Sequence, residues 1–551
     1  MGSPSLPDVY QTICSLLPAM RGETRPLLTK ALESIEDRIS NGENVLLFLE
    51  APTGYGKSTL SLALYSAICQ GRHDIASRVI HVLPMRSIGT DMKKRMVEYV
   101  QELSKTLPVK TTDIGLQQMH SPGSPMLLRK FVITTLDTFI SSFYKIPASE
   151  ITKLERYGTS HFEIPRASIY TSLVVFDELH LYIGSKALAE GRSKSLTAAV
   201  ACIKSLLSAG VPIIISTATL PDAIKETIVH ELKLSGLERL IKEIIPSDSD
   251  RNFIKRKINV ETIPDGIIEK TCQEAEHGRV LVILNTVRKA VEIYEKLKQR
   301  LNNVILLHSR LVECERSRRL TLVSSSDPVV LVATQVVEAG VDLSFRVLIT
   351  EAAPPDSILQ RAGRVARRGG EGWVYVSPLT KEGSSVYDGE IVDRTYVQLE
   401  KRRVLDQSLI GIYDEYFKVR HVDLIDNVYR NVLSDIDLYP SYSVDFALKV
   451  WKAVCGFVRD GEQVSIIPIQ HLDYVIRDGK KISEYVFCVD DDQFERMVKN
   501  GSVKKVIHED WRITDFSGNL NFKKCLSTQF FRRGILAFAV EGYSEEVGFV
   551  G

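Results

Sequence analysis

The chain has 551 residues, of which 44% are hydrophobic and 25% are charged, and its formal net charge is +1. This length exceeds what one compact core accommodates, so three or four domains are expected, and any basic surface for a nucleic acid must be local. No apolar run approaches the roughly 18 residues of a membrane span, which predicts a protein with no membrane partner.

The N-terminus and the cysteines predict a cytoplasmic location. The opening residues, MGSPSLPDVYQ, lack the basic start and apolar core of a secretory signal. The eight cysteines, from Cys14 to Cys525, are scattered and form no C-x-x-C pair. We therefore expect reduced thiols and no zinc or iron–sulfur site.

A glycine-rich loop, EAPTGYGKSTL, follows a short apolar run that is typical of a buried strand. Apolar residues at helical spacing come after Ser58, so the loop lies between a strand and a helix. Backbone N–H groups at a helix N-terminus attract anions, and Gly54 and Gly56 let the backbone wrap closely around a phosphate. Lys57 can reach the β- and γ-phosphates of a nucleotide, and the Ser58 hydroxyl can coordinate magnesium.

The loop departs from the usual pattern at one position, because Ala51 stands where a glycine is common. A glycine turn with a surface lysine is the alternative interpretation. Strand, loop and helix agree with one another, however, so the sequence predicts a site for a nucleotide and Mg²⁺. The expected nucleotide contacts are Ala51, Pro52, Thr53, Gly54, Tyr55, Gly56, Lys57, Ser58 and Thr59.

Two carboxylates follow another apolar strand in LVVFDELHLY, residues 173–182. In an open α/β sheet, ligands bind at the carboxyl ends of the strands. Asp177 is predicted to hold magnesium together with Ser58, and Glu178 is predicted to polarise the attacking water. A solvated strand end is the alternative, but the phosphate loop earlier in the chain favours catalysis.

Other apolar runs with polar ends alternate with helical segments along the first half of the chain. This βα alternation predicts a parallel sheet with helices on both faces. The runs are RVIHVLPMRS (78–87), FVITTLDTF (131–139) and PIIISTATLP (212–221).

The alternation restarts after the polar stretch IIPSDSDRNF and continues to residue 370. This second unit has no phosphate loop, but Gln360, Arg361, Arg364 and Arg367 recur at helical spacing and can share one face. A plain basic helix is possible. Alternatively, Arg364 and Arg367 place guanidinium groups on the γ-phosphate, where such arginines raise the rate by about 10³–10⁵.

The domains expected from these patterns are 1–246, 247–385 and 386–551. The last region is the least informative, with a helical start followed by short strands and turns. Its aromatic side chains either fill a core or stack on bases, and the core is the more common outcome. They are Trp451, Phe457, Tyr485, Phe487, Trp511, Phe516 and Phe530.

Nine blocks in this order resemble the superfamily 2 helicases of the DExH type over about residues 25–368. The blocks are APTGYGKS, LPMRS, TTLDT, DELH, STATLP, NTVRKA, LHSR, ATQVVEAGVDLS and QRAGRVARRG. Within that superfamily, DELHLY and the later blocks are most similar to the CRISPR-associated helicase of type I interference systems. The implied fold is α/β, with two tandem RecA-like doubly wound parallel-sheet domains and a C-terminal accessory domain.

The resemblance implies that ATP lies in a cleft between two RecA-like domains. The phosphate loop and DELH then act from one side, and the expected groups on the other side are Gly340, Asp342, Gln360, Arg364 and Arg367. It also implies translocation 3′ to 5′ along single-stranded DNA, through contacts with phosphates that do not read sequence. The expected nucleic-acid track is Pro84, Arg86, Thr135, Asn285, Thr286, His308, Arg310, Thr334 and Gln335.

The family also implies two protein partners, an RNA-guided CRISPR surveillance complex that opens the target duplex and an HD nuclease. About 25 residues precede the first helicase segment, which is too few for a nuclease domain. The dipeptide His73-Asp74 lies inside the first motor unit and is expected to form a surface turn. We therefore expect the nuclease to be a separate subunit.

Two positions depart from the family pattern. Leu28 stands near the place of a glutamine that reads adenine, although Arg25 could stack on the base. Thr217 replaces the serine of the more common SAT motif.

Two other functions stay open, a generic DExH helicase in repair or RNA metabolism, and a nucleotide-gated clamp with poor turnover. Glu178 and the arginines argue against a clamp, because a clamp needs no activation of water.

Overall fold

The structure is a computed structural model. It describes residues 4–550 except 21, 53, 85, 119–120, 183–191, 219, 252–254, 265, 326, 328, 339–342, 381–382, 384–385, 421–423, 439–442, 459–460 and 478–481. The chain forms two compact units, each assembled from separate stretches. The first comprises Met1–Glu150, Ser160–Lys255 and Tyr413–Leu448, and the second Ile151–Thr159, Arg256–Ile412 and Lys449–Gly551. The expected division at residues 246 and 385 stays a prediction.

An eight-stranded sheet forms the centre of the first unit, in the order β4-β3-β5-β2-β6-β7-β1-β8. Neighbouring strands are parallel except for β3 and β4. The strands are β1 (Leu46–Glu50), β2 (Arg78–Leu83), β3 (Ile114–Gln118), β4 (Ser121–Pro122), β5 (Phe131–Thr135), β6 (Ser172–Asp177), β7 (Ile213–Thr217) and β8 (Ile241–Ile244).

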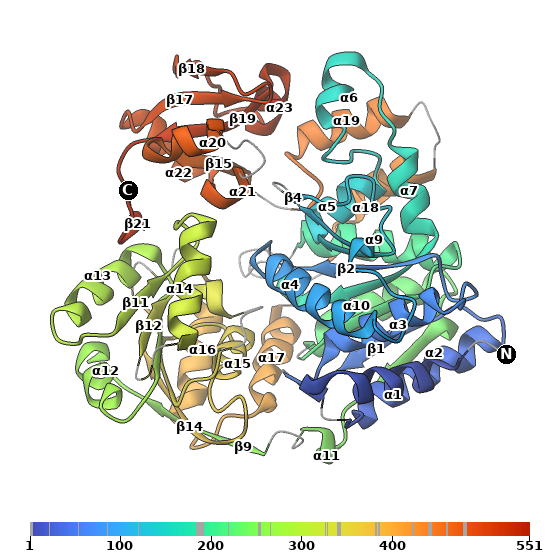
Figure 1. The fold of residues 1–551 in the computed structure, drawn as a ribbon, viewed down its shortest axis with the longest axis horizontal. Coiled ribbons are helices and arrows are strands. Elements are labelled where there is room, and N and C mark those ends of the chain that lie inside the picture. Colours follow the sequence, from blue (N-terminus) through green and yellow to red (C-terminus); the bar gives the residue numbers. More distant parts are fainter. Residues whose placement is uncertain are drawn as a thin grey trace. The chain divides into compact units, whose positions relative to one another are not determined.

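Helices cover both faces of this sheet, with α1, α2 and α3 on one face and α5, α7 and α9 on the other (Figure 1). Strands buried on both faces are apolar along their length, which explains the unbroken runs in the sequence. The helices are α1 (Leu6–Leu16), α2 (Pro26–Ser40), α3 (Lys57–Cys69), α4 (Arg86–Leu103), α5 (Leu136–Phe143), α7 (Glu163–Tyr170), α9 (Lys194–Ser208), α10 (Asp222–Lys233), α11 (Asp248–Arg251) and α18 (Asn427–Leu438).

A parallel six-stranded sheet forms the centre of the helicase-like part of the second unit, in the order β11-β12-β10-β13-β14-β9. Its strands are β9 (Arg256–Thr262), β10 (Val280–Ile283), β11 (Val304–Leu307), β12 (Val330–Ala333), β13 (Val347–Glu351) and β14 (Gly370–Ser377). Its helices are α12 (Ile267–Ala275), α13 (Val287–Lys298), α14 (Glu313–Ser325), α15 (Pro355–Ala362) and α16 (Gly389–Glu400), with the short 3₁₀ turn η5 (Gln335–Val337). The expected fold class, an α/β protein with RecA-like parallel sheets, is confirmed.

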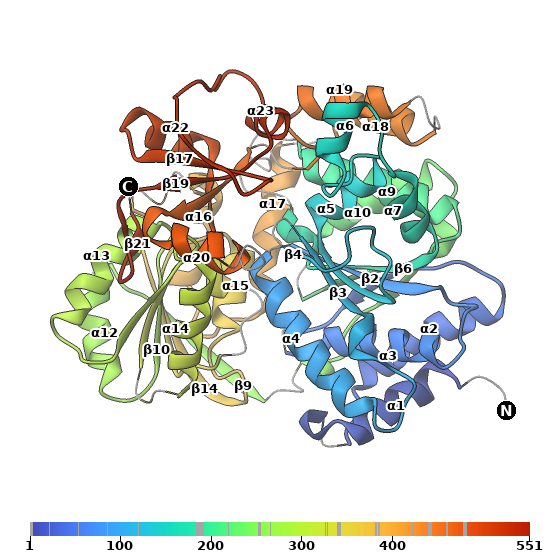
Figure 2. The same cartoon turned by 45° about the horizontal axis from the view of Figure 1, so that its top comes forward.

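The C-terminal part of the second unit adds a mostly antiparallel sheet in the order β16-β15-β19-β17-β18. Figure 2 labels two of its strands, β17 and β19. Its strands are β15 (Gln463–Pro468), β16 (Phe487–Asp490), β17 (Val503–His508), β18 (Ile513–Asp515) and β19 (Ile535–Val540), followed by the small pair β20 (Tyr543–Ser544) and β21 (Gly548–Phe549). The helices around it are α6 (Ile151–Tyr157), α20 (Leu472–Arg477), α21 (Ile482–Tyr485), α22 (Asp491–Lys499) and α23 (Leu526–Arg533).

Most of the C-terminal aromatic residues belong to the protein core. Trp451, Phe457 and Phe487 are buried, and Phe516 and Phe530 pack against the core of this sheet. Trp511 differs, because 39% of it is exposed. The sequence pattern alone does not separate core packing from base stacking, since both need large aromatic side chains.

A segment expected in the accessory region packs instead on the first unit. Helix α18 contacts α9, and Asp437 at its end accepts hydrogen bonds from Arg166 and Tyr170 at 3.0 and 3.1 Å. Lys145 donates to the carbonyl of Ile436 at 2.7 Å. Helix α17 (Gly411–Arg420) leads into this segment and α19 (Ser443–Ala453) leads out of it. The first unit is therefore completed by residues far along the chain.

Candidate nucleotide and nucleic-acid site

The phosphate loop lies between β1 and α3, at the carboxyl edge of the first sheet. The backbone φ angles of Gly54 and Gly56 are 86° and 94°, a region that side chains disfavour, so glycine is needed at both positions. Gly56 is the N-cap of α3, which begins at Lys57. The N–H of Ala51 donates to the carbonyl of Thr217 at 2.8 Å and ties the loop to β7. Thr53 lies outside the described residues.

Lys57 and Glu178 form an ion pair at this edge. The other Glu178 oxygen, Oε2, accepts hydrogen bonds from the Thr217 hydroxyl at 2.9 Å and the Ala218 N–H at 3.1 Å. Glu178 has a φ angle of 49°, which is uncommon for a residue with a side chain and is held by these contacts. The structure thus brings together the lysine, the glutamate and the threonine of three separate sequence motifs.

Asp177 lies beside this ion pair, and one of its carboxylate oxygens lacks a protein partner. His81 Nε2 is 3.6 Å from Asp177 Oδ2, whereas buried Oδ1 has no hydrogen-bond partner within the described part of the chain. Burial alone raises the pKa of the Asp177 carboxyl, but the His81 ring and the Lys57 charge outweigh it and hold the pKa below its usual range. Asp177 is therefore a carboxylate with an oxygen available for a ligand.

A magnesium ion fits the oxygen ligands at this position. Mg²⁺ prefers carboxylate and hydroxyl oxygens, which Asp177 and Ser58 supply. Ser58 is the second residue of α3, directly after Lys57. The orphaned Oδ1 of Asp177 is the observation in favour of this ligand set.

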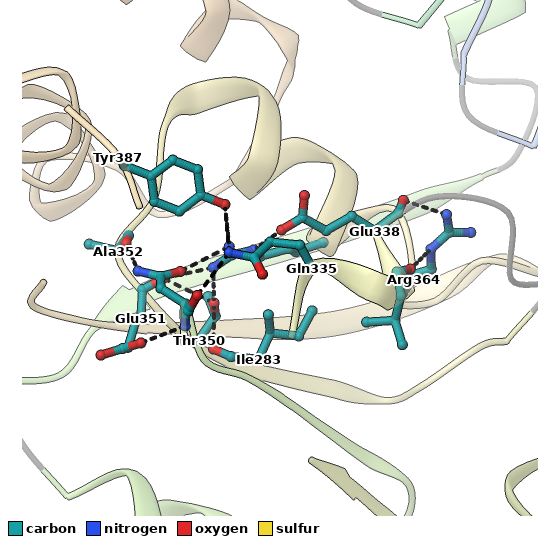
Figure 3. A network of polar contacts seen from close by, with 11 residues as sticks. Ile283, Gln335, Glu338, Thr350, Glu351, Ala352, Arg364 and Tyr387 are labelled. Atoms are coloured by element: carbon teal, nitrogen blue, oxygen red, sulfur yellow. Dashed lines mark hydrogen bonds and ion pairs between the residues drawn. The ribbon is translucent and has the colours of Figure 1, made fainter. Parts of the chain in front are cut away.

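The second unit contains a buried polar network around Arg361, which is 0% exposed. Its guanidinium donates to Glu338 at 2.7 Å, to the Thr350 hydroxyl at 2.7 Å and to Asn285 at 3.0 Å. Further hydrogen bonds run to the carbonyl of Glu351 and the hydroxyl of Tyr387 at 3.1 Å. Figure 3 shows Gln335 and Tyr387 within the same network. A fully buried arginine therefore joins the ends of β10 and β13 to Glu338 and Tyr387.

The remaining arginines lie beyond the end of helix α15. The helix ends at Ala362, Gly363 caps it, and Ala366 has a φ angle of 46°. The expectation that all four polar residues share one helical face is therefore wrong, since Arg364 and Arg367 follow the helix. Arg364 donates to the carbonyls of Val337 and Glu338 at 2.9 and 2.6 Å (Figure 3). Arg367 is partly exposed.

The other predicted nucleotide contacts differ in burial and in position within the fold. Gln360 is buried with 9% exposure, whereas Gly340 and Asp342 lie outside the described residues. Arg25 is the N-cap of α2, and its N–H donates to the Tyr10 hydroxyl at 3.3 Å. Their roles toward ATP stay predictions.

The predicted nucleic-acid residues lie at the carboxyl ends of strands in each sheet. Pro84 and Thr135 belong to the ends of β2 and β5 in the first unit. In the second unit, the ends of β10, β11 and β12 are followed by Asn285, Thr286, His308, Arg310, Thr334 and Gln335. Thr135, Asn285, His308 and Thr334 are buried, so their side chains face the protein. The side chain of Arg86 lies outside the described residues.

His308 is held inside the second unit by the end of the chain. Its Nε2 donates to the carbonyl of Val547 at 3.0 Å, and its Nδ1 accepts from the Arg310 N–H at 3.2 Å. Burial lowers the pKa of His308 to about 3, so the ring is neutral at ordinary pH. A phosphate contact through this ring stays a prediction, and both ring nitrogens already have protein partners.

Comparisons with known proteins fit this arrangement. A family model described as DEAD/DEAH box helicase matches residues 29–227, and one described as CRISPR-associated nuclease/helicase Cas3, C-terminal, matches residues 276–370. The CRISPR-associated helicase Cas3 of Thermoproteus tenax is 28% identical over 430 residues, which cover 74% of this chain and 67% of the relative. The CRISPR-associated nuclease/helicase Cas3 of Methanothermobacter thermautotrophicus is 25% identical over 460 residues, which cover 75% of this chain and 51% of the relative.

Solved structures agree with the sequence matches. The crystal structure of T. fusca Cas3-ADP has a TM-score of 0.65 at 16% identity, covering 98% of this chain and 69% of that chain. In sequence and in fold, the chain is similar to the CRISPR-associated Cas3 helicases. The predicted resemblance is thereby confirmed, and the helicase is an ATP-dependent nucleic-acid enzyme. It spans about half to two thirds of the length of these curated relatives.

The helicase has site residues that the sequence interpretation missed. His81 bonds to the Ser61 hydroxyl at 2.8 Å and lies next to Asp177, and its only sequence signal is a polar residue inside an apolar strand. Tyr182 donates to the carbonyls of Val82 and Asp177 at 3.0 and 3.2 Å. Both residues support the strand ends that carry the predicted chemistry.

The accessory sheet brings a second arginine toward the predicted nucleic-acid residues. Arg310 is half-buried, and its guanidinium forms no hydrogen bond or ion pair with any described residue. Burial lowers the pKa of Arg310, Asp490 opposes this effect, and the charge of Arg496 adds to it. Arg496 is exposed on α22, more than 180 residues further along the chain, so no local pattern links the two.

In the described part of the helicase, no helix is long and apolar enough to cross a membrane.

Proposed function

We propose that the helicase uses ATP and Mg²⁺ to move 3′ to 5′ along single-stranded DNA during type I CRISPR interference. The observation that carries the proposal is the cluster of Lys57, Glu178 and Asp177 at the carboxyl edge of the first sheet. Lys57 and Glu178 are 121 positions apart in the sequence, yet their side chains are in contact. Structures titled Cas3-ATP and Cas3-AMPPNP are among the folds similar to this chain.

Lys57 and Glu178 would change partners when ATP binds. A γ-phosphate is a stronger partner for the lysine than one carboxylate, because it carries more charge and more acceptor oxygens. Glu178 would then be released from Lys57 and could accept a proton from the attacking water. Its second oxygen would keep its bonds to Thr217 and Ala218, which fix the orientation of the carboxylate.

Magnesium would be held by Asp177 and Ser58, and when bound it neutralises charge on the β- and γ-phosphate oxygens. The low pKa of Asp177 keeps the carboxylate ionised for this role. Arg364 and Arg367 are both proposed to reach the γ-phosphate, and Arg364 also donates to the carbonyls of Val337 and Glu338. Gln360, Gly340 and Asp342 are proposed to complete the nucleotide contacts.

DNA is proposed to contact the strand-end residues through its phosphates. Arg310 is the best-supported cation for this role, because its guanidinium has no partner among the described residues. A structure titled "Mycobacterium smegmatis helicase Lhr bound to ssDNA and AMP-PNP" is similar, with a TM-score of 0.51. Contacts of this kind would hold DNA of any sequence.

The proposed partners are an RNA-guided surveillance complex and a separate HD nuclease. A structure titled "CRISPR RNA-guided surveillance complex, pre-nicking" is similar over 92% of this chain, with a TM-score of 0.58. Among the described residues, the group with metal-ligand spacing is Cys455, Glu462 and Cys525, which contains no histidine. An HD nuclease needs histidine and aspartate ligands, so DNA cleavage is proposed to depend on a nuclease outside the described residues.

The test is ATP hydrolysis measured with no nucleic acid, with single-stranded DNA and with single-stranded RNA. DNA should stimulate hydrolysis strongly and RNA weakly. Equal stimulation would favour a generic helicase, and binding without turnover would favour a clamp. DNA strands with one blocked end then test direction. Incubation with Mg²⁺, Mn²⁺ or Ni²⁺ should leave DNA uncut, and cleavage that copurifies with the chain and persists in Lys57→Ala would contradict a separate nuclease.

A further inference from the structure

Tyr55, in the middle of the phosphate loop, is buried with 1% exposure. Its hydroxyl donates to Asp250 Oδ1 at 2.5 Å and accepts from the N–H of Leu27 at 3.3 Å. Burial raises the pKa of Tyr55, and the Asp250 carboxylate raises it further, so the phenol keeps its proton. Asp250 accepts the Tyr55 proton as an ionised carboxylate, which makes this a strong hydrogen bond.

Asp250 is itself fixed by the turn in which it stands. It is 4% exposed, and its Oδ2 accepts from the N–H and the hydroxyl of Ser247 at 3.0 and 2.6 Å. Burial raises the pKa of Asp250, but the bonds from Ser247 and Tyr55 outweigh it and lower the pKa below its usual range. The carboxylate is therefore ionised and bonded on both oxygens, by Tyr55 of the phosphate loop on Oδ1 and by Ser247, the residue before α11, on Oδ2.

Helix α11 is the last element of the first unit before the chain enters the second unit. It follows β8, which pairs with β1, the strand that leads into the phosphate loop. The first unit ends at Lys255, and the chain then enters the second unit at Arg256. The segment that leaves the first unit is therefore bound to the phosphate loop through a side-chain contact between Tyr55 and Asp250.

The loop on either side of Tyr55 is suited to move while Tyr55 stays attached. Gly54 and Gly56 flank it with positive φ angles of 86° and 94°. Glycine tolerates changes in these angles at little cost, so phosphate binding can shift the loop backbone. Such a shift changes the distance or angle of the Tyr55–Asp250 bond, and thus its contribution to holding α11.

We infer that Tyr55 and Asp250 form a positioning pair that links nucleotide occupancy of the phosphate loop to the segment joining the two units. This inference rests on the proposed function, because it requires a nucleotide in the loop. A ligand can change this segment only if its contacts differ between two arrangements of the segment, and the Tyr55–Asp250 bond supplies such a contact. The pair acts through the loop backbone and need not touch the nucleotide.

The experiment measures trypsin cleavage of the full chain at Arg251 and Lys255, both of which are exposed. Cleavage is followed with and without a non-hydrolysable ATP analogue, at a concentration that saturates each variant. The variants are Asp250→Asn, Tyr55→Phe and the double substitution. In the unsubstituted protein, the analogue should change the cleavage rate at these sites by about fivefold or more, the lower end of coupling between linked sites.

Each single variant should lose most of this nucleotide-dependent change, and the double variant should lose no more than either single one. Tyr65→Phe is the matched control, because Tyr65 is a buried tyrosine on α3 whose hydroxyl donates to Asp113 at 3.0 Å. It removes an equivalent hydrogen bond away from this segment and should leave the change intact.

The outcomes separate the inference from the proposed function. If the unsubstituted protein binds no ATP analogue, the proposed function fails. If it binds the analogue but Asp250→Asn and Tyr55→Phe respond like the unsubstituted protein, the positioning pair is overturned. If Tyr65→Phe loses the response as well, the effect is a general loss of packing and the inference is also overturned. Should Tyr55→Phe fail to fold, Asp250→Asn alone decides.

Discussion

At the scale of single residues, the proposed catalytic edge depends on a few side chains that contact one another. Lys57 binds Glu178, and Glu178 binds the end of β7. A substitution that keeps shape but removes charge separates these functions, because hydrogen bonds to Thr217 and Ala218 can persist while proton transfer cannot.

Glu178→Gln should therefore bind ATP and hydrolyse it about 10²–10⁴ times more slowly, the usual effect of removing a general base. Lys57→Ala should lose ATP binding as well as turnover. Hydrolysis under saturating ATP and binding of a fluorescent nucleotide measure the two effects. Glu243→Gln on β8 is the control, since Glu243 is an exposed partner of Lys225. Normal hydrolysis by Glu178→Gln would contradict its assignment as the base.

Arg361 provides a second test at this scale. Burial raises the pKa of Glu338, and the Arg361 charge opposes this, so the two depend on each other. Arg361→Met should lower the free energy of unfolding by about 3–5 kcal/mol, because it leaves Glu338 buried without its partner. Urea denaturation measures this. Arg394→Met on α16 should have little effect, since its pair with Glu390 is exposed. If adding Glu338→Gln to Arg361→Met restored no stability, the pair would not be coupled.

At the scale of elements, the end of the chain is built into the second unit. Arg319 donates to the carbonyls of Glu545 and Glu546 at 2.6 and 2.7 Å, and Tyr543 accepts from the Val312 N–H at 3.2 Å. The residues Tyr543–Phe549 therefore support the strand end that carries His308 and Arg310. Because this support keeps His308 buried, the stability of the second unit should depend on pH.

The folded-state pKa of His308 is about 3, below the unfolded value of about 6.5. For a histidine buried in its neutral form, the stabilising effect is complete above the unfolded pKa and declines as pH falls from about 6.5 toward 3. We expect several kcal/mol of stability to be lost in this window. In His308→Asn the loss between about pH 6.5 and 4 should be smaller, as measured by thermal unfolding. His73→Asn is the control, because His73 is exposed. An unchanged profile in His308→Asn would argue against a neutral buried ring.

A further test concerns the polar contacts that hold helix α18 on the first unit. Asp437 accepts from Arg166, Tyr170 and Ser205. Asp437→Asn should weaken these bonds and speed hydrogen exchange of α18 amides, while exchange in β6 and β7 stays slow. Asp435→Asn on the exposed side of the same helix should change little. Equal exchange in both variants would mean that α18 is held by apolar contacts alone.

At the scale of the whole molecule, charge is balanced, so DNA binding must depend on local cations. Arg310→Ala should weaken binding of single-stranded DNA of any sequence and reduce the slope of log affinity against log salt by about 0.7–1. Arg496→Ala should have a similar but smaller effect, because Arg496 is more exposed. Lys499→Ala is the control on the same helix, where Lys499 pairs with Glu495. A slope that is the same in all variants would show that these arginines do not contact phosphates.

The sequence predicted those parts of the fold that depend on neighbouring residues. Both parallel sheets follow from apolar runs, and the phosphate loop follows from Gly54, Gly56 and Lys57 between a strand and a helix. The contact of Lys57 with Glu178 was not predicted in detail, since it depends on the order of strands in the sheet. The end of α15 before Arg364 was also missed, because spacing alone does not reveal where a helix stops. Arg496 and Asp250 depend on tertiary packing and give no local signal.

Because each unit is assembled from separate stretches of the chain, the two units can be completed only in a certain order during synthesis. A ribosome releases residues from the N-terminus onward, so the first sheet can form early, but its unit stays incomplete until Leu448 has emerged. Segment Ile151–Thr159 faces the opposite delay, because the C-terminal sheet that it joins is made last. An early stop or a cut at a conventional domain boundary would leave each half without a piece carried by the other. The two units must therefore be synthesised as parts of one chain.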